Sequence, residues 1–236
     1  MLAEFAGRRM ELPSRAIPLL VVHDEPAQAL AAAEALVARE YARVQWLDVP
    51  LAAEPQAHAS RLPAARLWSP SPFVERVHER APRGRALDMA SGSGRTAVFL
   101  ALAGWQAEAW DIDASALAMA AAFAQRQGTS IATRQVDLES GALAPPDRLF
   151  NLIVVVRYLH RPLFAWLEQA LAPGGVLVYE TFRRGQELFG RPARARHLLE
   201  PGELEQAFPS LAVELHEESA LDAPPVMARL LARRPA

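Results

Sequence analysis

The sequence Ala86-Leu-Asp-Met-Ala-Ser-Gly-Ser-Gly-Arg-Thr-Ala97 changes from an apolar strand to a turn with two glycines and then to a helix. Glycines at such a turn let a ligand approach the backbone, and the start of a helix offers N–H groups that have no partner within the helix. Gly92 to Ala97 also fits the dinucleotide-binding pattern G-x-G-x-x-G/A, so the turn by itself leaves the kind of ligand open. The stretch therefore predicts a cofactor site where a strand meets a helix.

Strands and helices alternate on both sides of this turn. We expect strands at 85–90, 107–111, 131–136, 150–156, 175–181, 211–216 and 226–232, and helices at 72–80, 94–104, 114–126, 162–171 and 202–208. This alternation is typical of an α/β protein, and it predicts a Rossmann-like, seven-stranded, mostly parallel sheet with helices on both faces. Ligands of such sheets bind at the carboxyl ends of the strands.

The N-terminal part predicts a separate small unit. A strand at 17–22, a helix at 26–40 and a strand at 42–48 form a βαβ pattern. Prolines then interrupt any periodic pattern, and we place a linker around residues 50–65. We therefore predict a small βαβ unit with its linker over residues 1–60 and the main domain over residues 61–236.

Composition excludes several classes of chemistry. The 236 residues are 51% hydrophobic and 22% charged, which is typical of a folded protein. The chain has no cysteine, so it forms no disulfide, thiolate metal site or cysteine nucleophile, and it has no lysine for a Schiff base. The net charge of −2 gives no global attraction to nucleic acid or to an anionic membrane. With strand-sized apolar runs and no signal sequence, we expect a cytoplasmic enzyme without a membrane partner.

Acidic residues at the ends of three successive strands favour one cofactor. Asp88, four residues before Gly92, would repel a pyrophosphate, whereas Asp111 ends the next strand and can accept the hydroxyls of a ribose. Asp137 follows the third strand and suits an adenine amino group. S-adenosylmethionine has an amino group, a ribose and an adenine but no phosphate, so it fits these acids. The alternative is a nicotinamide oxidoreductase, which needs room for a pyrophosphate beside Asp88.

Four segments together resemble the class I S-adenosylmethionine-dependent methyltransferases over about residues 66–234. They are Leu87–Arg95 for the first motif, Asp111–Leu117 for the second, Asp137–Leu138 for the third and Leu171–Leu177 for the late L-x-P-G-G-x-L signature. The later sequence resembles a bacterial group that is distantly related to tellurite-resistance methyltransferases. The resemblance implies S-adenosyl-L-methionine as the cofactor and methyl transfer as the reaction.

The resemblance also implies roles for individual residues. Asp88 supports the first motif and the cofactor's amino end, Asp111 holds the ribose, and Asp137 with Leu138 recognises adenine. The expected cofactor-binding residues are Trp68, Asp88, Ala90, Ser91, Gly92, Gly94, Asp111, Ile112, Asp137, Leu138, Val156 and Arg157. Ala90 stands where the family commonly has glycine, and alanine would cost stability if the backbone there needs a positive φ. We expect Asp113 to be the N-cap of the following helix.

Candidate residues for the methyl acceptor follow the strands at 150–156 and 175–181. Tyr158, His160 and Glu180 are the expected catalytic residues, with His160 as a general base or as a group that orients the acceptor. The motif D/N-P-P-Y of nucleobase amino methylation is missing, which makes nucleic acid an unlikely partner. We predict in-line methyl transfer to a small molecule. The alternatives are a noncatalytic S-adenosylmethionine-binding module and an RNA methyltransferase.

Two further segments lead to expectations about partners. The first 60 residues resemble the later part of a rhodanese domain, but His23-Asp-Glu-Pro stands where a catalytic cysteine loop would follow. Packing, or dimerisation into a homodimer, is therefore the expected role of this degenerate unit. Residues 183–197 contain five arginines and one acid. We expect either a solvated basic loop or, through Arg191 and Arg194, selection of an anionic acceptor with a carboxylate or phosphate.

Overall fold

The computed structural model describes residues 8, 11–13, 15–48, 68–141, 143–144 and 147–236. The chain divides into two compact units, Met1–Ser69 and Pro70–Ala236. The predicted boundary after residue 60 and the predicted linker at 50–65 lie outside the described residues. Among the helices of the described part, none has the length and apolar character that crossing a membrane requires.

The first unit is the predicted βαβ arrangement. Strands β1 (Leu19–Val21) and β2 (Val44–Trp46) pair in parallel and are joined through helix α2 (Pro26–Val37). Pro26 suits the first turn of α2 because its missing N–H would have no partner there. The buried side of the helix has the spacing of one helical face and consists of Ala29, Ala32, Ala33 and Leu36.

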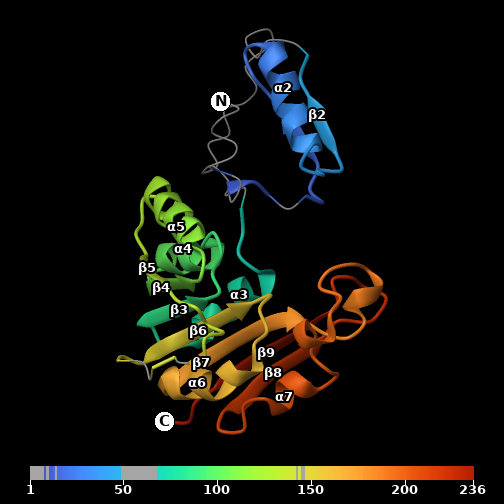
Figure 1. Cartoon of the computed structure of the whole chain (residues 1–236). Coiled ribbons are helices and arrows are strands. Elements are labelled where there is room, and N and C mark those ends of the chain that lie inside the picture. Colours follow the sequence, from blue (N-terminus) through green and yellow to red (C-terminus); the bar gives the residue numbers. More distant parts are fainter. Residues whose placement is uncertain (1–7, 9–10, 14, 49–67, 142, 145–146) are drawn as a thin grey trace. The chain divides into compact units, whose positions relative to one another are not determined.

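The second unit is built on the predicted seven-stranded sheet (Figure 1). Its strands are β3 (Arg85–Met89), β4 (Gln106–Asp111), β5 (Ala132–Gln135), β6 (Phe150–Val156), β7 (Leu171–Phe182), β8 (Ala212–Glu218) and β9 (Met227–Arg233). They lie in the order β5-β4-β3-β6-β7-β9-β8, and β9 is antiparallel to both of its neighbours while the other pairs are parallel. The predicted Rossmann-like fold is confirmed.

Helices cover both faces of this sheet. They are α3 (Pro72–Val77), α4 (Arg95–Leu102), α5 (Ala114–Arg126), α6 (Phe164–Ala170) and α7 (Glu203–Gln206), with 3-10 turns η3 (His78–Arg80), η4 (Arg161–Leu163), η5 (Gln186–Leu188) and η6 (Ala195–His197). Leu87 and Met89 of β3 point to one face, where α6 and α7 contribute to the main core. On the other face, Ala97 of α4 packs with Ala109 of β4 and Leu117 of α5.

The central strand β6 is apolar without interruption from Leu152 to Val156, as expected for a strand that is covered on both sides. Its neighbour β7 begins at Leu171, earlier than the predicted strand at 175–181, and pairs with β6 through a register shift between Phe150 and Leu152. Strands β3, β4, β5 and β6 run in parallel, so their carboxyl ends meet at one edge of the sheet. The predicted cofactor residues of the second unit lie along this edge.

Candidate functional site

The turn between β3 and α4 has a left-handed backbone at three residues. The φ angles are 55° at Ala90, 51° at Gly92 and 77° at Gly94. A Cβ atom at Gly94 would lie 2.5 Å from the Cβ of Ala120 on α5, whereas one at Gly92 would meet nothing within 4 Å. Gly94 therefore allows close packing of α4 on α5, while Gly92 leaves the backbone open to a ligand. Ala90 does adopt the positive φ for which its side chain is poorly suited.

Asp88 is buried beneath this turn. Its Oδ2 accepts a 3.0 Å hydrogen bond from the N–H of Ala97 in the first turn of α4. Burial raises the pKa of Asp88 to about 7; the Ala97 N–H opposes this rise, and the neighbouring carboxylate of Asp111 adds to it. A cation at this position would favour the ionised carboxylate, as expected for the positively charged end of a ligand.

Asp111 joins two successive turns at the edge of the sheet. Its Oδ2 accepts a 2.7 Å hydrogen bond from the N–H of Gly92, and its Oδ1 accepts one of 2.9 Å from the N–H of Asp113. Asp113 is the N-cap of α5 and accepts from the N–H groups of Ser115 and Ala116, which confirms the predicted cap. The neighbouring Ile112 is 60% exposed. Asp111 is thus the acid that faces the glycine turn.

The Ser91 hydroxyl lies under the same turn. It is buried and has no hydrogen-bond partner among the described residues. The Ser91 main chain is well held, because its N–H donates to the Trp110 carbonyl and its carbonyl accepts from Gly94. A buried hydroxyl without a partner is costly, so the position suits a polar ligand group.

The third predicted contact follows β5. Asp137 is exposed, and its Oδ1 accepts a 2.9 Å hydrogen bond from the N–H of Glu139. Leu138 is buried, and its side chain belongs to the main core with Leu87 and Met89. A ligand would therefore meet the main chain of Leu138 rather than its side chain.

Tyr158, two residues after the end of β6, lies close to the acids that follow β5. Its hydroxyl lies 3.5 Å from Oε1 of Glu139. Burial, together with the charges of Glu139, Asp137 and Asp111, raises the pKa of the phenol well above its usual range. Tyr158 is therefore protonated at neutral pH and can donate a hydrogen bond. Sequence reasoning missed Glu139, although the pattern Asp137-Leu-Glu139 was a signal that a second acid lies nearby.

The first residues after β6 form a strained corner. Val156 is partly buried, and Arg157 is exposed with φ at 57°, an uncommon conformation for a long side chain. The N–H of Arg157 donates a 2.7 Å hydrogen bond to the carbonyl of Glu180 on β7. This bond holds the corner at the carboxyl edge of the sheet.

Three further predicted site residues, Glu180, His160 and Trp68, have different burial and different partners. Glu180 is buried and forms a 2.7 Å ion pair with Arg229, its partner on the antiparallel strand β9. This gives Glu180 a structural role that sequence reasoning did not foresee. His160 is partly buried, and its carbonyl accepts from the N–H of Leu163. Trp68 is 3% exposed and belongs to the first unit.

Comparison with known proteins identifies this architecture. TehB from Haemophilus influenzae has a similar structure, with a TM-score of 0.56 and 16% identity over 69% of this chain and 61% of TehB. An S-adenosylmethionine-dependent methyltransferase from Clostridium acetobutylicum has a TM-score of 0.56 and 14% identity over 70% of this chain and 90% of the Clostridium chain. The N-methyltransferase NodS from Bradyrhizobium japonicum has a TM-score of 0.53 and 19% identity over 70% of this chain and 98% of NodS. The chain thus spans less than two thirds of TehB. The fold is that of the class I methyltransferases.

The sequence comparison agrees with the fold. Residues 86–175 match the family described as methyltransferase domain, and this range runs from strand β3 into strand β7. No curated protein matches the sequence. The second unit thus has the class I methyltransferase fold, and residues 86–175 within it match a methyltransferase domain.

Proposed function

We propose that this protein transfers a methyl group from S-adenosylmethionine to a small-molecule acceptor. The observation that carries the proposal is the open backbone at Gly92 between the buried carboxylate of Asp88 and the half-buried carboxylate of Asp111. This arrangement has acceptors for a cationic, hydroxyl-rich donor.

The residues fit the donor group by group. Asp88 supports the turn electrostatically beneath the donor's positive end, and the buried Ser91 hydroxyl is available to its amino-acid part. Asp111 keeps free lone pairs for ribose hydroxyls, and Asp137 is our candidate for the adenine amino group. When bound, S-adenosylmethionine supplies an electrophilic methyl group on a sulfonium, which the acceptor displaces in line.

On the acceptor side, the protein aligns the nucleophile and handles its proton. Tyr158 is a hydrogen-bond donor because its phenol stays protonated. His160 directly precedes η4 and is our candidate to take the acceptor's proton where it has one to lose. The ion pair with Arg229 makes Glu180 a weaker candidate for this step.

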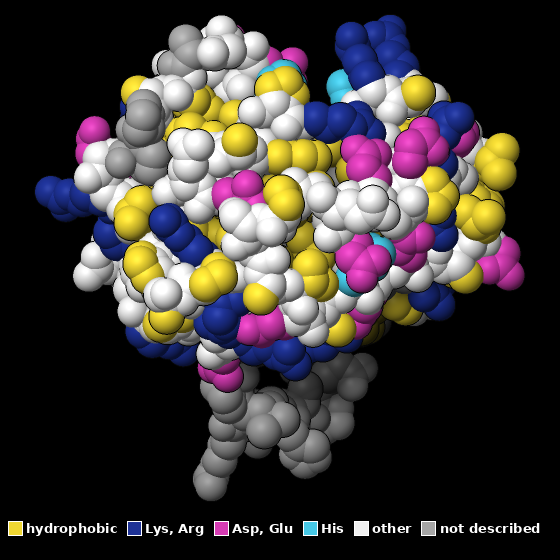
Figure 2. All heavy atoms as spheres, turned by 90° about the horizontal axis from the view of Figure 1, so that it is seen from below, with side chains coloured by type: hydrophobic (Ala, Val, Ile, Leu, Met, Phe, Trp, Pro, Cys, Tyr) yellow, Lys and Arg dark blue, Asp and Glu magenta, His cyan; other side chains and the backbone are white. Residues whose placement is uncertain are grey.

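The net charge gives no general attraction to nucleic acid, which supports a small-molecule acceptor. The formal net charge is −2, and acidic and basic side chains are intermixed on the face seen from below (Figure 2). Nucleic-acid backbones are bound by continuous basic surfaces, which this face does not offer. We keep a cytoplasmic location and a homodimer as predictions from the sequence.

Two measurements test the proposal. The first is thermal stabilisation of the full chain by S-adenosylhomocysteine and, separately, by NAD; stabilisation by NAD alone would overturn it. The second is transfer of labelled methyl from S-adenosylmethionine to cell extract separated into small molecules, RNA and protein, with Asp111→Ala as the matched control. We expect label in the small-molecule fraction. Label in RNA alone would contradict the acceptor class, and donor binding with no transfer to any fraction would favour the noncatalytic module.

A further inference from the structure

Acidic residues gather on one side of the carboxyl edge of the sheet, whereas the other side carries both arginines and glutamates. The acids lie on the segments that follow β3, β4 and β5 or end these strands, namely Asp88, Asp111, Asp137 and Glu139. Arginines lie after β6 and in the connection from β7 to β8, namely Arg157, Arg183, Arg184, Arg191, Arg194 and Arg196. The acidic side suits the cationic donor. The arginines on the other side would attract a ligand of negative charge.

The first two arginines of the connection have structural partners. Arg183 is buried, lies 3.4 Å from a carboxylate oxygen of Glu218 and donates a 2.8 Å hydrogen bond to the carbonyl of Ser219. Arg184 lies between Glu187 at 3.4 Å and Glu200 at 3.6 Å. These two arginines stabilise the base of the connection, and their charges are compensated.

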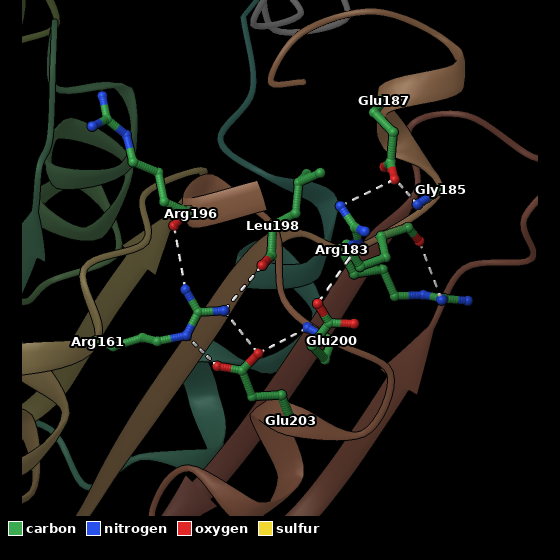
Figure 3. A network of polar contacts seen from close by, with 9 residues as sticks. Arg161, Arg183, Gly185, Glu187, Arg196, Leu198, Glu200 and Glu203 are labelled. Carbon is green, nitrogen blue, oxygen red and sulfur yellow. Dashed lines mark hydrogen bonds and ion pairs between the residues drawn. The ribbon is translucent and has the colours of Figure 1, made fainter. Parts of the chain in front are cut away.

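A second network fixes the other end of the connection beside the candidate site (Figure 3). The Arg161 guanidinium pairs with Glu203 and donates to the carbonyls of Leu198 at 3.0 Å and Arg196 at 3.3 Å. Arg161 directly follows His160 in the chain. The main chain at Arg196 is therefore held against the segment that includes the candidate base.

The Arg196 side chain takes no part in that network. Figure 3 shows it pointing away from the Arg161–Glu203 pair, and it is exposed. Its Nε donates a 3.0 Å hydrogen bond to Nε2 of His197. No carboxylate of the described residues forms an ion pair with Arg196, so the charge is not compensated.

Arg157 is a second uncompensated cation at the same edge. It is exposed, and its guanidinium carbon lies 6.0 Å from the ring centre of Phe182, the last residue of β7. The Phe182 carbonyl in turn accepts a 3.0 Å hydrogen bond from the N–H of Leu199, close to Arg196 in the chain. Within the described part of the chain, Arg157 also has no ion pair.

We propose that the methyl acceptor carries a carboxylate or phosphate group, and that Arg157 and Arg196 bind it. Two exposed guanidinium groups on connected segments gain most from a shared anion, because each can donate two parallel hydrogen bonds to its oxygens. Arg191 and Arg194 are exposed on the same connection and add to the positive field. This inference deepens the proposed function and rests on it.

Inorganic phosphate is the probe for this site. We would titrate it into the full chain with and without saturating S-adenosylhomocysteine, and follow binding by phosphorus NMR. Wild type should bind phosphate, and Arg157→Gln/Arg196→Gln should bind it at least about tenfold more weakly, since two charge-assisted contacts are lost. The matched control is Arg80→Gln, because Arg80 is exposed in η3, which precedes the amino end of β3. This control should bind phosphate like wild type.

The outcomes separate this inference from the proposed function. No phosphate binding by wild type, or equal binding by the double variant, would overturn the anion site even if the donor binds normally. Failure of S-adenosylhomocysteine to bind would contradict the proposed function and leave the phosphate comparison readable. A methylated product that mass spectrometry identifies as containing neither a carboxylate nor a phosphate would also overturn the anion site.

Discussion

The main-chain N–H of Gly92 donates a 2.7 Å hydrogen bond to Oδ2 of Asp111. This bond joins the turn after β3 to the end of β4, while Oδ1 of the same carboxylate holds the N–H of Asp113. Each carboxylate oxygen can accept a further hydrogen bond. Asp111 therefore keeps capacity to accept from a ribose, as the proposed function requires, while it shapes the turn.

Replacing Asp111 by alanine should weaken binding of S-adenosylhomocysteine by about 1.5–3 kcal/mol, because a charged acceptor for the ribose is lost. Isothermal calorimetry measures this. Asp113→Ala is the matched control: it removes the N-cap of α5 and should lower the free energy of unfolding by about 1 kcal/mol with little change in affinity. The opposite pattern would show that Asp113 is the ribose ligand.

Asp88 should make the stability of the donor-free protein depend on pH. Its pKa is raised to about 7 in the folded state from an ordinary value of 3.8, so the folded protein holds a proton that the unfolded chain has released. The resulting stabilisation is complete below pH 4 and is lost as the pH rises through 7, at up to about 1.4 kcal/mol per pH unit in between. Urea unfolding of wild type and Asp88→Asn at pH 5 and pH 8 tests this; parallel pH profiles would contradict it.

The two glycines of the turn should respond differently to alanine. Gly94→Ala places a Cβ 2.5 Å from that of Ala120 at a positive φ, and it should destabilise the fold by about 2 kcal/mol or more. Gly92→Ala meets no atom within 4 Å, so it should cost only about 1 kcal/mol in stability while weakening binding of S-adenosylhomocysteine. Thermal unfolding and calorimetry separate these effects, and equal destabilisation would be inconsistent with the packing described.

Substitution of Ala90 should stabilise the fold, whereas the glycine substitutions should destabilise it. Because Ala90 has φ at 55°, Ala90→Gly should relieve strain and raise the free energy of unfolding by about 1 kcal/mol. Urea unfolding measures the change. If Ala90→Gly is less stable than wild type, the packing of the alanine methyl group stabilises the fold by more than the backbone strain at this positive φ destabilises it.

Glu180 should matter more for folding than for proton transfer. Glu180→Ala leaves Arg229 without its 2.7 Å partner in a mostly buried position, which should cost about 3 kcal/mol of stability. Glu180→Gln should retain most methyl transfer per folded molecule, whereas His160→Gln should lower it. A large loss of turnover in folded Glu180→Gln, with normal donor binding, would restore Glu180 as a catalytic residue.

Much of the fold and the local geometry of the glycine turn follow from local sequence. The alternation of apolar strands and helices predicts the elements of both units, because each depends on side chains within a few residues of one another. The glycine turn and the acids at the strand ends are likewise local patterns. Asp88, Asp111 and Asp113 could therefore be assigned to turn, strand end and helix cap before any contact was known.

Tertiary structure alone decided which charges are available for chemistry. The antiparallel register of β9 places Arg229 beside Glu180, and the return of the chain after β7 places Glu218 beside Arg183, far away in sequence. Sequence could count the arginines of residues 183–197 but could not separate the paired ones from Arg196. The physical reason is that an ion pair depends on distance in space, which packing of the whole sheet determines, whereas a turn or cap depends on neighbours along the chain.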